Sequence, residues 1–337
     1  MATVLDAQFG IADESTYGTA VTPTRFYEVQ SGDGFEYRPN RVQGTGMRPG
    51  SIGPRSARRV TPNFDYGASM NAEVLSRGFG LLFEKFTGGT PTVNAITGGY
   101  QQVFTLGGAL KPFTGQLGVP RIGADGSTTI DAFTGEGCTV GSFGFAMSNA
   151  DILKATYSLD VQDMTTATAL ATATYSSGAN LFSFAGFSVY GGSYTAPTTT
   201  ALATGGTPLA NVTDFSFDVT RNADVTRYLA GLAGKHAIPI PGIAGVSGSL
   251  GIEYSDTVYR DGYLNDTDLV LVGNFIGAQL SGSVYEAVQV CLANIRLEGE
   301  LPKPTGETTK AACGFTGLED GTNPLLQIVY RTADTAL

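Results

Sequence analysis

Tryptophan is missing from this 337-residue sequence, and histidine occurs only once, as His236. A single histidine excludes a histidine-rich zinc site and leaves little room for Ser–His or Cys–His catalysis. The three cysteines, Cys138, Cys291 and Cys313, include no Cys-x-x-Cys pair, so we expect buried free thiols in a reducing cytoplasm. We therefore predict no metal site and no cofactor, and we interpret His236 as a loop or interface residue.

The sequence also lacks the short motifs of common enzyme classes. It has no Gly-x-Ser-x-Gly elbow, no His-Glu-x-x-His pair and no phosphate-binding P-loop. Residues 44–46 begin a Gly-x-Gly, but Pro49 stands where the third glycine of a nucleotide fingerprint belongs. Glycoside hydrolysis needs two carboxylates, yet 30 acidic residues make accidental pairs expected, and a common sugar-stacking side chain is missing. We predict that the protein is not an enzyme.

Charged residues are scarce at 15%, and the formal net charge is −10. Such an acidic chain is not expected to hold nucleic acid tightly. No apolar run reaches 18 residues, and the first residues have neither a basic nor an apolar signal region, so we expect neither a membrane helix nor secretion. A porin-type barrel would suit the low charge and the 46 glycines, but the missing signal disfavours it.

Alternation of apolar and polar residues is the clearest positive signal. Residues 157–161, 215–219, 250–254 and 326–330 alternate in this way, which predicts strands with one buried face. Helical spacing appears in residues 69–86 and, more briefly, in residues 255–264. We therefore expect a mainly β protein with two helices.

An internal repeat is suggested by short matches that recur in the same order at a nearly constant offset. The matched segments are 35–37 with 217–219, 64–69 with 250–255, Leu117 and Arg121 with Leu292 and Arg296, and 153–157 with 326–330. The low-complexity stretch 165–177 separates the two sets. We expect two related β domains, residues 1–165 and 178–337.

One segment, residues 38–59, is strongly basic and contains no acidic residue. Its arginines are Arg38, Arg41, Arg48, Arg55, Arg58 and Arg59. Its many glycines and prolines predict an extended loop between two strands. A solvated loop and a nucleic-acid arm are two interpretations, although the arm would lack aromatic stacking residues. We favour a docking arm, because a basic loop complements an acidic, identical neighbour in a head-to-tail assembly.

Several phrases of the sequence resemble the major tail (tail tube) proteins of long-tailed siphophages. They are Phe9-Gly-Ile-Ala-Asp-Glu-Ser-Thr-Tyr-Gly-Thr-Ala-Val-Thr-Pro-Thr24, Gly78-Phe-Gly-Leu-Leu82, Asn294-Ile-Arg-Leu-Glu-Gly-Glu-Leu-Pro302 and the ending at residues 315–330. The order of the strands, the long loop and the helix is also similar. The resemblance covers nearly the whole chain.

The resemblance implies β-sandwich or barrel domains, each with one flanking α-helix. Six such domains form a ring, and stacked rings form a tail tube around the tape measure protein, through which DNA later reaches the host. A chain with two domains favours a trimer with pseudo-sixfold symmetry over a hexamer. The implied partners are the chain itself, the tape measure protein, and the tail terminator and distal tail proteins. The implied location is the virion tail, after synthesis in the host bacterial cytoplasm.

The resemblance also implies roles for particular residues. The basic segment 38–59 corresponds to the family's ring-stacking loop. Four carboxylates that alternate with apolar neighbours, Glu36, Asp65, Asp218 and Glu253, are expected to face the lumen, where they would let DNA slide without specific binding. Outer solvent is the alternative position for each.

Other structural and binding functions stay open from the sequence. A capsid-decorating protein or a distal tail protein would share the β-rich composition. A secreted adhesin or polysaccharide-binding protein is a third alternative, disfavoured by the missing tryptophan and secretion signal.

Overall fold

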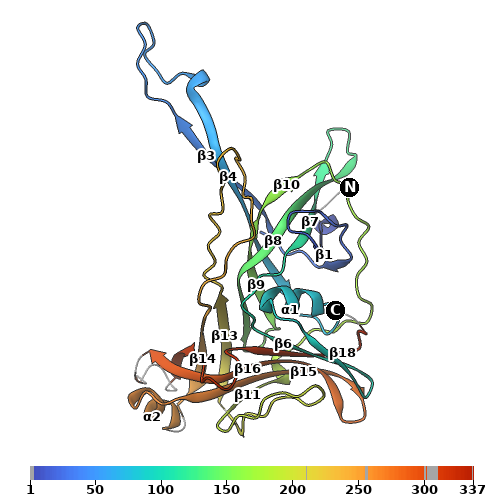
Figure 1. Cartoon of the computed structure of the whole chain (residues 1–337). Coiled ribbons are helices and arrows are strands. Elements are labelled where there is room, and N and C mark those ends of the chain that lie inside the picture. Colours follow the sequence, from blue (N-terminus) through green and yellow to red (C-terminus); the bar gives the residue numbers. More distant parts are fainter. Residues whose placement is uncertain (1–3, 210, 255–256, 300, 302–309, 336) are drawn as a thin grey trace.

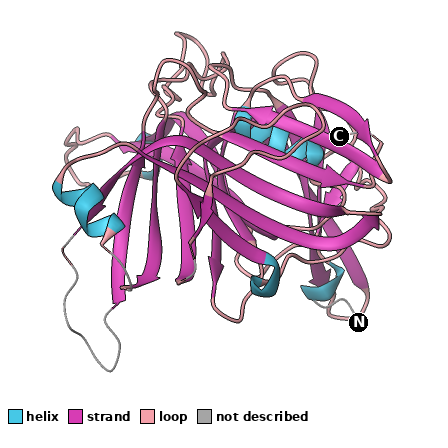
Figure 2. Ribbon diagram, turned by 90° about the horizontal axis from the view of Figure 1, so that it is seen from below, coloured by secondary structure: helices cyan, strands magenta, loops and turns pink. Residues whose placement is uncertain are grey.

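The computed structural model describes residues 4–209, 211–254, 257–299, 301, 310–335 and 337. The chain is mainly β, as predicted, with two α-helices beside a large antiparallel sheet (Figures 1 and 2). The helices are α1 (Gly80–Thr87) and α2 (Val258–Leu264). The first-half strands are β1 (Gln8–Asp13), β2 (Arg25–Tyr27), β3 (Gly34–Gln43), β4 (Arg59–Glu73), β5 (Thr92–Ile96), β6 (Gly99–Thr105), β7 (Phe113–Ile122), β8 (Thr128–Ser148), β9 (Lys154–Val161) and β10 (Asp163–Thr165). The second-half strands are β11 (Phe187–Gly191), β12 (Thr207–Pro208), β13 (Val212–Thr220), β14 (Gly245–Glu253), β15 (Leu269–Ser281), β16 (Val284–Gly299), β17 (Lys310–Gly317) and β18 (Gln327–Thr332).

A continuous antiparallel sheet runs through both halves of the chain. Its strand order is β3-β4-β9-β8-β13-β14-β17-β16. The long strand β8 belongs to two layers, because its first part pairs with β7 and β10 and its last part pairs with β9 and β13. The change occurs near Cys138, where the partner on one edge of β8 changes from β7 to β13 and the partner on the other edge changes from β10 to β9. This main sheet, defined by the strands above, provides the frame for the rest of the molecule.

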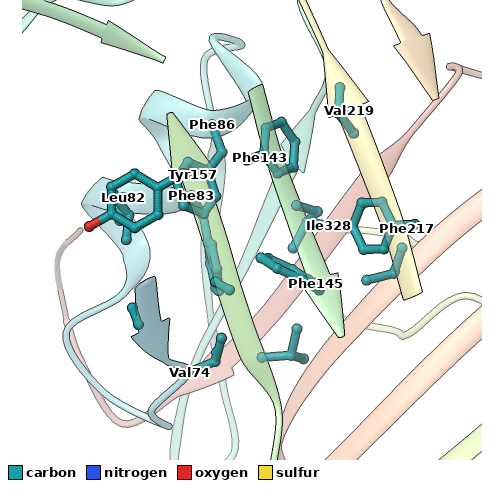
Figure 3. Close-up of a cluster of buried hydrophobic side chains, with 14 of the residues drawn as sticks. Val74, Leu82, Phe83, Phe86, Phe143, Phe145, Tyr157, Phe217, Val219 and Ile328 are labelled. Carbon is teal, nitrogen blue, oxygen red and sulfur yellow. The ribbon is translucent and has the colours of Figure 1, made fainter. Parts of the chain in front are cut away.

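The core lies on one face of the main sheet and is rich in phenylalanine. Helix α1 lays Phe83 and Phe86 onto it, and Phe86 stacks on Phe143 of β8 with ring centroids 4.8 Å apart (Figure 3). Phe145 and Phe217, from the neighbouring strands β8 and β13, meet edge to face at 5.2 Å. Each fully buried aromatic side chain contributes about 1.5–3 kcal/mol through removal of apolar surface from water. One core therefore joins residues from both halves.

The predicted helix over residues 69–86 is wrong in its first part. Strand β4 continues to Glu73, because Ala68, Met70 and Ala72 alternate as buried residues and pair with β9. Gly78 has φ of +84°, and the chain turns there before α1 begins at Gly80. Leu82, Phe83 and Phe86 of the expected helical stripe lie on α1, whereas Val74 and Phe79 lie in the connection between β4 and α1. The second predicted helix, residues 255–264, is α2, which begins at Val258.

The strand order repeats within the chain. The order β3-β4-β9-β8 recurs as β13-β14-β17-β16, and the pair Phe35–Ala68 recurs as Phe217–Gly248. The hairpin β5–β6 has no counterpart among the described residues of the second half. The number of residues that separates matched segments of the two halves is therefore smaller after this hairpin than before it. The early match of residues 35–37 with 217–219 therefore joins equivalent strands. The match of residues 153–157 with 326–330 does not, because β9 corresponds to β17 and not to β18.

The matched pair of Leu117 and Leu292 fails for the same reason. Leu117 lies on β7, whose place in the meander β7-β8-β9 corresponds to β15 in the meander β15-β16-β17. Leu292 lies on β16, and so does Arg296, the proposed counterpart of Arg121. These residues occupy neighbouring positions in the two meanders and are not equivalent.

Two further contacts, besides the main sheet and the core, join the two halves. Strand β18 pairs with β16 on one edge and with β6 of the first half on the other. Arg221, at the end of β13, is buried and donates hydrogen bonds to the carbonyls of Gly107 and Ala109, each at 2.7 Å, and to that of Thr87 at 3.3 Å. Thr87 is the last residue of α1, so this guanidinium satisfies a helix C-terminal carbonyl.

Candidate functional site

The face of the main sheet opposite the core is polar, because side chains alternate across each strand. Glu36 and Asp65 lie on this polar face, since their neighbours in β3 and β4 carry the core residues. Asp218 and Glu253 lie on the same face, alternating with Phe217, Val219 and Ile252 in β13 and β14. All four carboxylates singled out in the sequence therefore share one face of one sheet.

The centre of the polar face carries small side chains. Ser142 and Ser158 are hydrogen-bonded at 2.7 Å across β8 and β9, and Ser216 and Ser249 at 3.0 Å across β13 and β14. Further carboxylates that the sequence analysis did not single out lie on this face: Glu73, Asp160, Asp214 and Glu298. Their alternation with buried residues was readable from the sequence. Among the described side chains, the carboxylates of this face thus outnumber the cations that share it, which are Arg38, Lys154, Lys235 and Arg296.

A cluster of charged residues occupies the polar face where the halves meet. Arg38 Nε donates to Glu36 Oε2 at 2.9 Å, and Arg38 Nη1 lies 3.7 Å from Asp65 Oδ2. Lys235 Nζ pairs with both Asp65 and Asp160, and its side chain is only 2% exposed. This charge cluster is defined by Glu36, Arg38, Asp65, Asp160 and Lys235. Two of the four predicted carboxylates are therefore engaged in ion pairs within the chain.

The protonation of the charge cluster reflects its burial. Burial raises the pKa of Asp160 to about 6, although the hydrogen bond and charge of Lys235 act in the opposite direction. Burial also penalises the charged form of Lys235, but the hydrogen bonds to Asp160 and Asp65 outweigh it and raise the pKa of this amine. Asp65 and Asp160 thus share one ammonium, and burial makes Asp160 easier to protonate than an ordinary aspartate.

Lys235 belongs to the long connection between β13 and β14, residues 221–244. This connection runs beside β4 beyond the end of β9, where Phe64 N donates to Ala233 O at 3.1 Å (Figure 1). The Tyr228 hydroxyl donates to Phe64 O at 3.1 Å. His236 is exposed on the same connection, and its backbone N–H donates to Arg227 O at 3.0 Å. The connection therefore supports the base of the β3–β4 hairpin.

The β3–β4 hairpin projects from the body of the molecule (Figure 1). The predicted basic loop is shorter than expected: residues 44–58 connect the strands, whereas Arg38 and Arg41 lie on β3 and Arg59 begins β4. Arg41, Arg48, Arg58 and Arg59 are exposed, and the half-buried Arg55 donates to Gly46 O at 3.4 Å. The tip also exposes two large apolar side chains completely, Met47 and Ile52. A basic rim with apolar residues is a surface suited to another protein.

The N-terminal phrase at residues 9–24 has a structural role that sequence reasoning missed. Glu14 is 4% exposed, and its carboxylate accepts hydrogen bonds from Thr114 Oγ1 at 2.8 Å and from the N–H groups of Gly18 and Gly137 at 2.9 Å. Gly18 has φ of +74°, a conformation that favours glycine. Glu14 therefore ties the first segment to β7 and β8.

Among the residues that the structure describes, no three His, Cys, Asp or Glu side chains gather in a way that could hold a metal ion. Cys138 and Cys291 are buried free thiols, and burial raises the pKa of each. Within the same residues, no helix is long and apolar enough to cross a membrane.

Comparison with known proteins identifies the family. Among curated protein sequences, none is significantly similar to this chain. The family model described as phage tail tube protein matches residues 5–309, which is nearly the whole chain and includes every strand of the main sheet except β17, both helices and the projecting hairpin. The chain therefore belongs to the phage tail tube proteins and is a structural protein of the bacteriophage tail.

Proposed function

We propose that this chain forms rings that stack into the tail tube, and that DNA reaches the host through the lumen of these rings. The observation that carries the proposal is that Glu36, Asp65, Asp218 and Glu253 share the polar face of one continuous sheet. Facing a lumen, an acidic wall repels phosphates and allows DNA to pass without specific binding.

The open sheet itself supports ring formation. Among the described residues, only β4 pairs with β3, so the outer edge of β3 presents unpaired backbone groups. Soluble proteins cover such edges or pair them, and closing the sheet across copies removes them. The repeated order of strands supports two tail-tube-type domains, residues 1–165 and 178–337. Three such chains then form a ring with pseudo-sixfold symmetry.

The projecting hairpin supports stacking. It carries Arg41, Arg48, Arg55, Arg58 and Arg59 on a chain whose net charge is −10, so it complements the acidic end of a copy in the next ring. The lumen holds the tape measure protein before DNA, and the tail terminator and distal tail proteins bind the two ends of the tube. The protein is made in the host bacterial cytoplasm and enters the virion as part of the tail.

Thiol labelling tests which face lines the lumen. Ser247→Cys places a thiol on the polar face, and Thr199→Cys places one on an exposed loop between β11 and β12. After assembly, a bulky polyethylene glycol maleimide should label Cys at 199 and spare Cys at 247, whereas a small maleimide should label both. Equal labelling of both positions by the bulky reagent would refute the lumen assignment.

A further inference from the structure

We propose that strand β3 of one copy pairs antiparallel with the C-terminal end of β16 of the next copy, in a register that sets Arg38 opposite Glu298. This contact rests on the proposed ring and specifies the surfaces that close it. A contact that already exists inside the chain is the template for this contact between chains.

The template is the pairing of β8 with β13, which joins the first strand order to the second. Its register sets Val219 opposite Phe143 and Thr220 opposite Ser142. Strand β13 begins the order β13-β14-β17-β16, and β8 ends the order β3-β4-β9-β8. Inside the chain, the last strand of one unit thus pairs with the first strand of the other.

The sequence match of residues 35–37 with 217–219 sets Phe35 equivalent to Phe217, and the cross-strand registers carry this equivalence to the other strands of the two units. Phe35 opposite Ala68 corresponds to Phe217 opposite Gly248, and these two pairs are followed by Leu159 and Phe315 in β9 and β17. Phe143 opposite Tyr157 corresponds to Gly299 opposite Cys313, because Tyr157 and Cys313 each lie two residues before Leu159 and Phe315.

Transferring the template then gives the contact between copies. Val219 corresponds to Tyr37, and Phe143 to Gly299, so Tyr37 lies opposite Gly299 of the next copy. One step further, Thr220 and Ser142 become Arg38 and Glu298. The transfer uses no charge information, yet it brings a cation opposite an anion, which is a stabilising cross-strand pair.

Both edges are available for this pairing. Among the described residues, β3 pairs only with β4. On β16, Ile295 pairs with both Leu269 and Gly317, so β15 and β17 occupy opposite edges of that strand. Past Ile295, the described part of the chain offers no further partner on the β15 edge, and both Glu298 and Gly299 are exposed.

The side chains of Arg38 and Glu298 both lie on the polar face of the main sheet. Arg38 lies on the polar face with its side chain 58% exposed. Glu298 lies on the polar face beside Thr316, whose hydroxyl donates to Glu298 Oε1 at 2.6 Å. Both groups are therefore exposed on the same face of the sheet, as a directly opposite pair requires.

Pro39 marks where the pairing ends. Its equivalent in the second unit is Arg221, whose N–H donates to Gly141 O at 2.9 Å as the last bond between β13 and β8. Proline has no N–H, so the pairing between copies stops at Arg38. Beyond this point the hairpin is free to leave the ring and project toward the next one.

Charge exchange tests the contact. Arg38→Glu and Glu298→Arg each place like charges opposite one another, and each should raise the protein concentration needed for assembly by about tenfold. The double exchange restores the pair between copies and should assemble at a lower protein concentration than either single variant, although it does not restore the contacts of Arg38 with Glu36 and Asp65. Circular dichroism of each variant checks that the monomer is folded.

Disulfide trapping tests the register. Directly opposite residues have Cα atoms about 4.5–5.5 Å apart, within disulfide reach. Arg38→Cys with Glu298→Cys should give oligomers linked by disulfides on a non-reducing gel, whereas Arg38→Cys with Arg296→Cys, two residues out of register, should not.

The outcomes separate the contact from the ring. If wild-type chains assemble but neither the double exchange nor the 38–298 disulfide behaves as stated, the ring survives and this contact is wrong. Wild-type chains that remain monomeric at the highest attainable concentration would overturn the ring, and the contact with it.

Discussion

Lys235 and Asp160 form an ion pair that joins the two halves of the chain. Lys235 comes from the β13–β14 connection and Asp160 from β9, and the lysine also pairs with Asp65 of β4. The ammonium of Lys235 is almost fully buried, and it balances the charges of two carboxylates on the polar face. This pairing fixes the second-half connection against the base of the projecting hairpin.

Removing Lys235 should be costly. Lys235→Met leaves two neighbouring carboxylates without their common cation, and the loss of one partner of a buried pair costs about 3 kcal/mol in the free energy of unfolding. Lys154→Met removes the same charge from a half-exposed pair with Asp151 and should cost less than about 1 kcal/mol. Urea unfolding measures both. Equal losses in the two variants would contradict the role given to Lys235.

Stability should fall as the pH rises through the titration of Asp160. The pKa of this group is raised to about 6 in the folded chain, whereas an unfolded aspartate titrates near about 4. The folded state therefore holds the proton more tightly, so the stabilisation is present below about pH 4 and is lost as the pH approaches 6.

The variant Asp160→Asn isolates this effect. Between about pH 4 and pH 6.5, the wild type should lose up to about 3 kcal/mol of unfolding free energy relative to the asparagine variant. The measurement is urea unfolding of both proteins across that range. Parallel pH profiles would show that Asp160 is not titrating there.

Glu14 should be essential for stability. Glu14→Gln removes a charge-assisted acceptor of three hydrogen bonds and places an amide N–H₂ against backbone donors, which should cost about 2–3 kcal/mol. Glu28→Gln makes the same chemical change at an exposed position and should change stability by less than about 0.5 kcal/mol. Thermal unfolding compares the two, and a neutral Glu14→Gln would remove the proposed tie.

The hairpin loop should be needed for stacking alone. Replacing residues 45–57 with Asn-Gly should leave the circular dichroism spectrum and ring formation unchanged but prevent tube growth, because the loop lies outside the body of the fold. A Gly/Ser loop of the original length separates the loop's chemistry from its length. Full-length tubes from either variant would contradict the stacking role.

Reversing a charge on the polar face should slow DNA passage. Glu253→Lys puts a cation on that face, and phosphates held there should slow DNA ejection by about twofold to tenfold without preventing tube assembly. Glu28→Lys makes the same charge change away from the main sheet and should eject normally. Normal ejection by phage carrying Glu253→Lys would remove the lumen role of this residue.

The sequence predicted what depends on local alternation. The period of two in residues 215–219 and 250–254 identified β13 and β14 and, with them, the face on which Asp218 and Glu253 lie. Helical spacing failed in residues 69–86, because it continues through the connection between β4 and α1, which is not helical. Sequence reasoning also failed where an insertion, the β5–β6 hairpin, shifted the repeat offset.

Contacts between distant segments were beyond such reasoning. Nothing near Lys235 in the sequence indicates Asp65 or Asp160, because the connection that carries it meets β4 only after the sheet has formed. Glu14 belongs to a segment that resembles the family, but its partners Thr114 and Gly137 lie 100 and 123 residues later in the sequence. Both positions are buried charges whose role depends on three-dimensional pairing.

Electron microscopy of the purified chain tests the central claim most directly. We predict hollow rings or tubes in negative stain, with class averages that contain three copies arranged with pseudo-sixfold symmetry and with the main sheet facing the hole. Particles without a central hole, or rings in which the β3–β4 hairpin points into the lumen and the main sheet faces outward, would contradict the account.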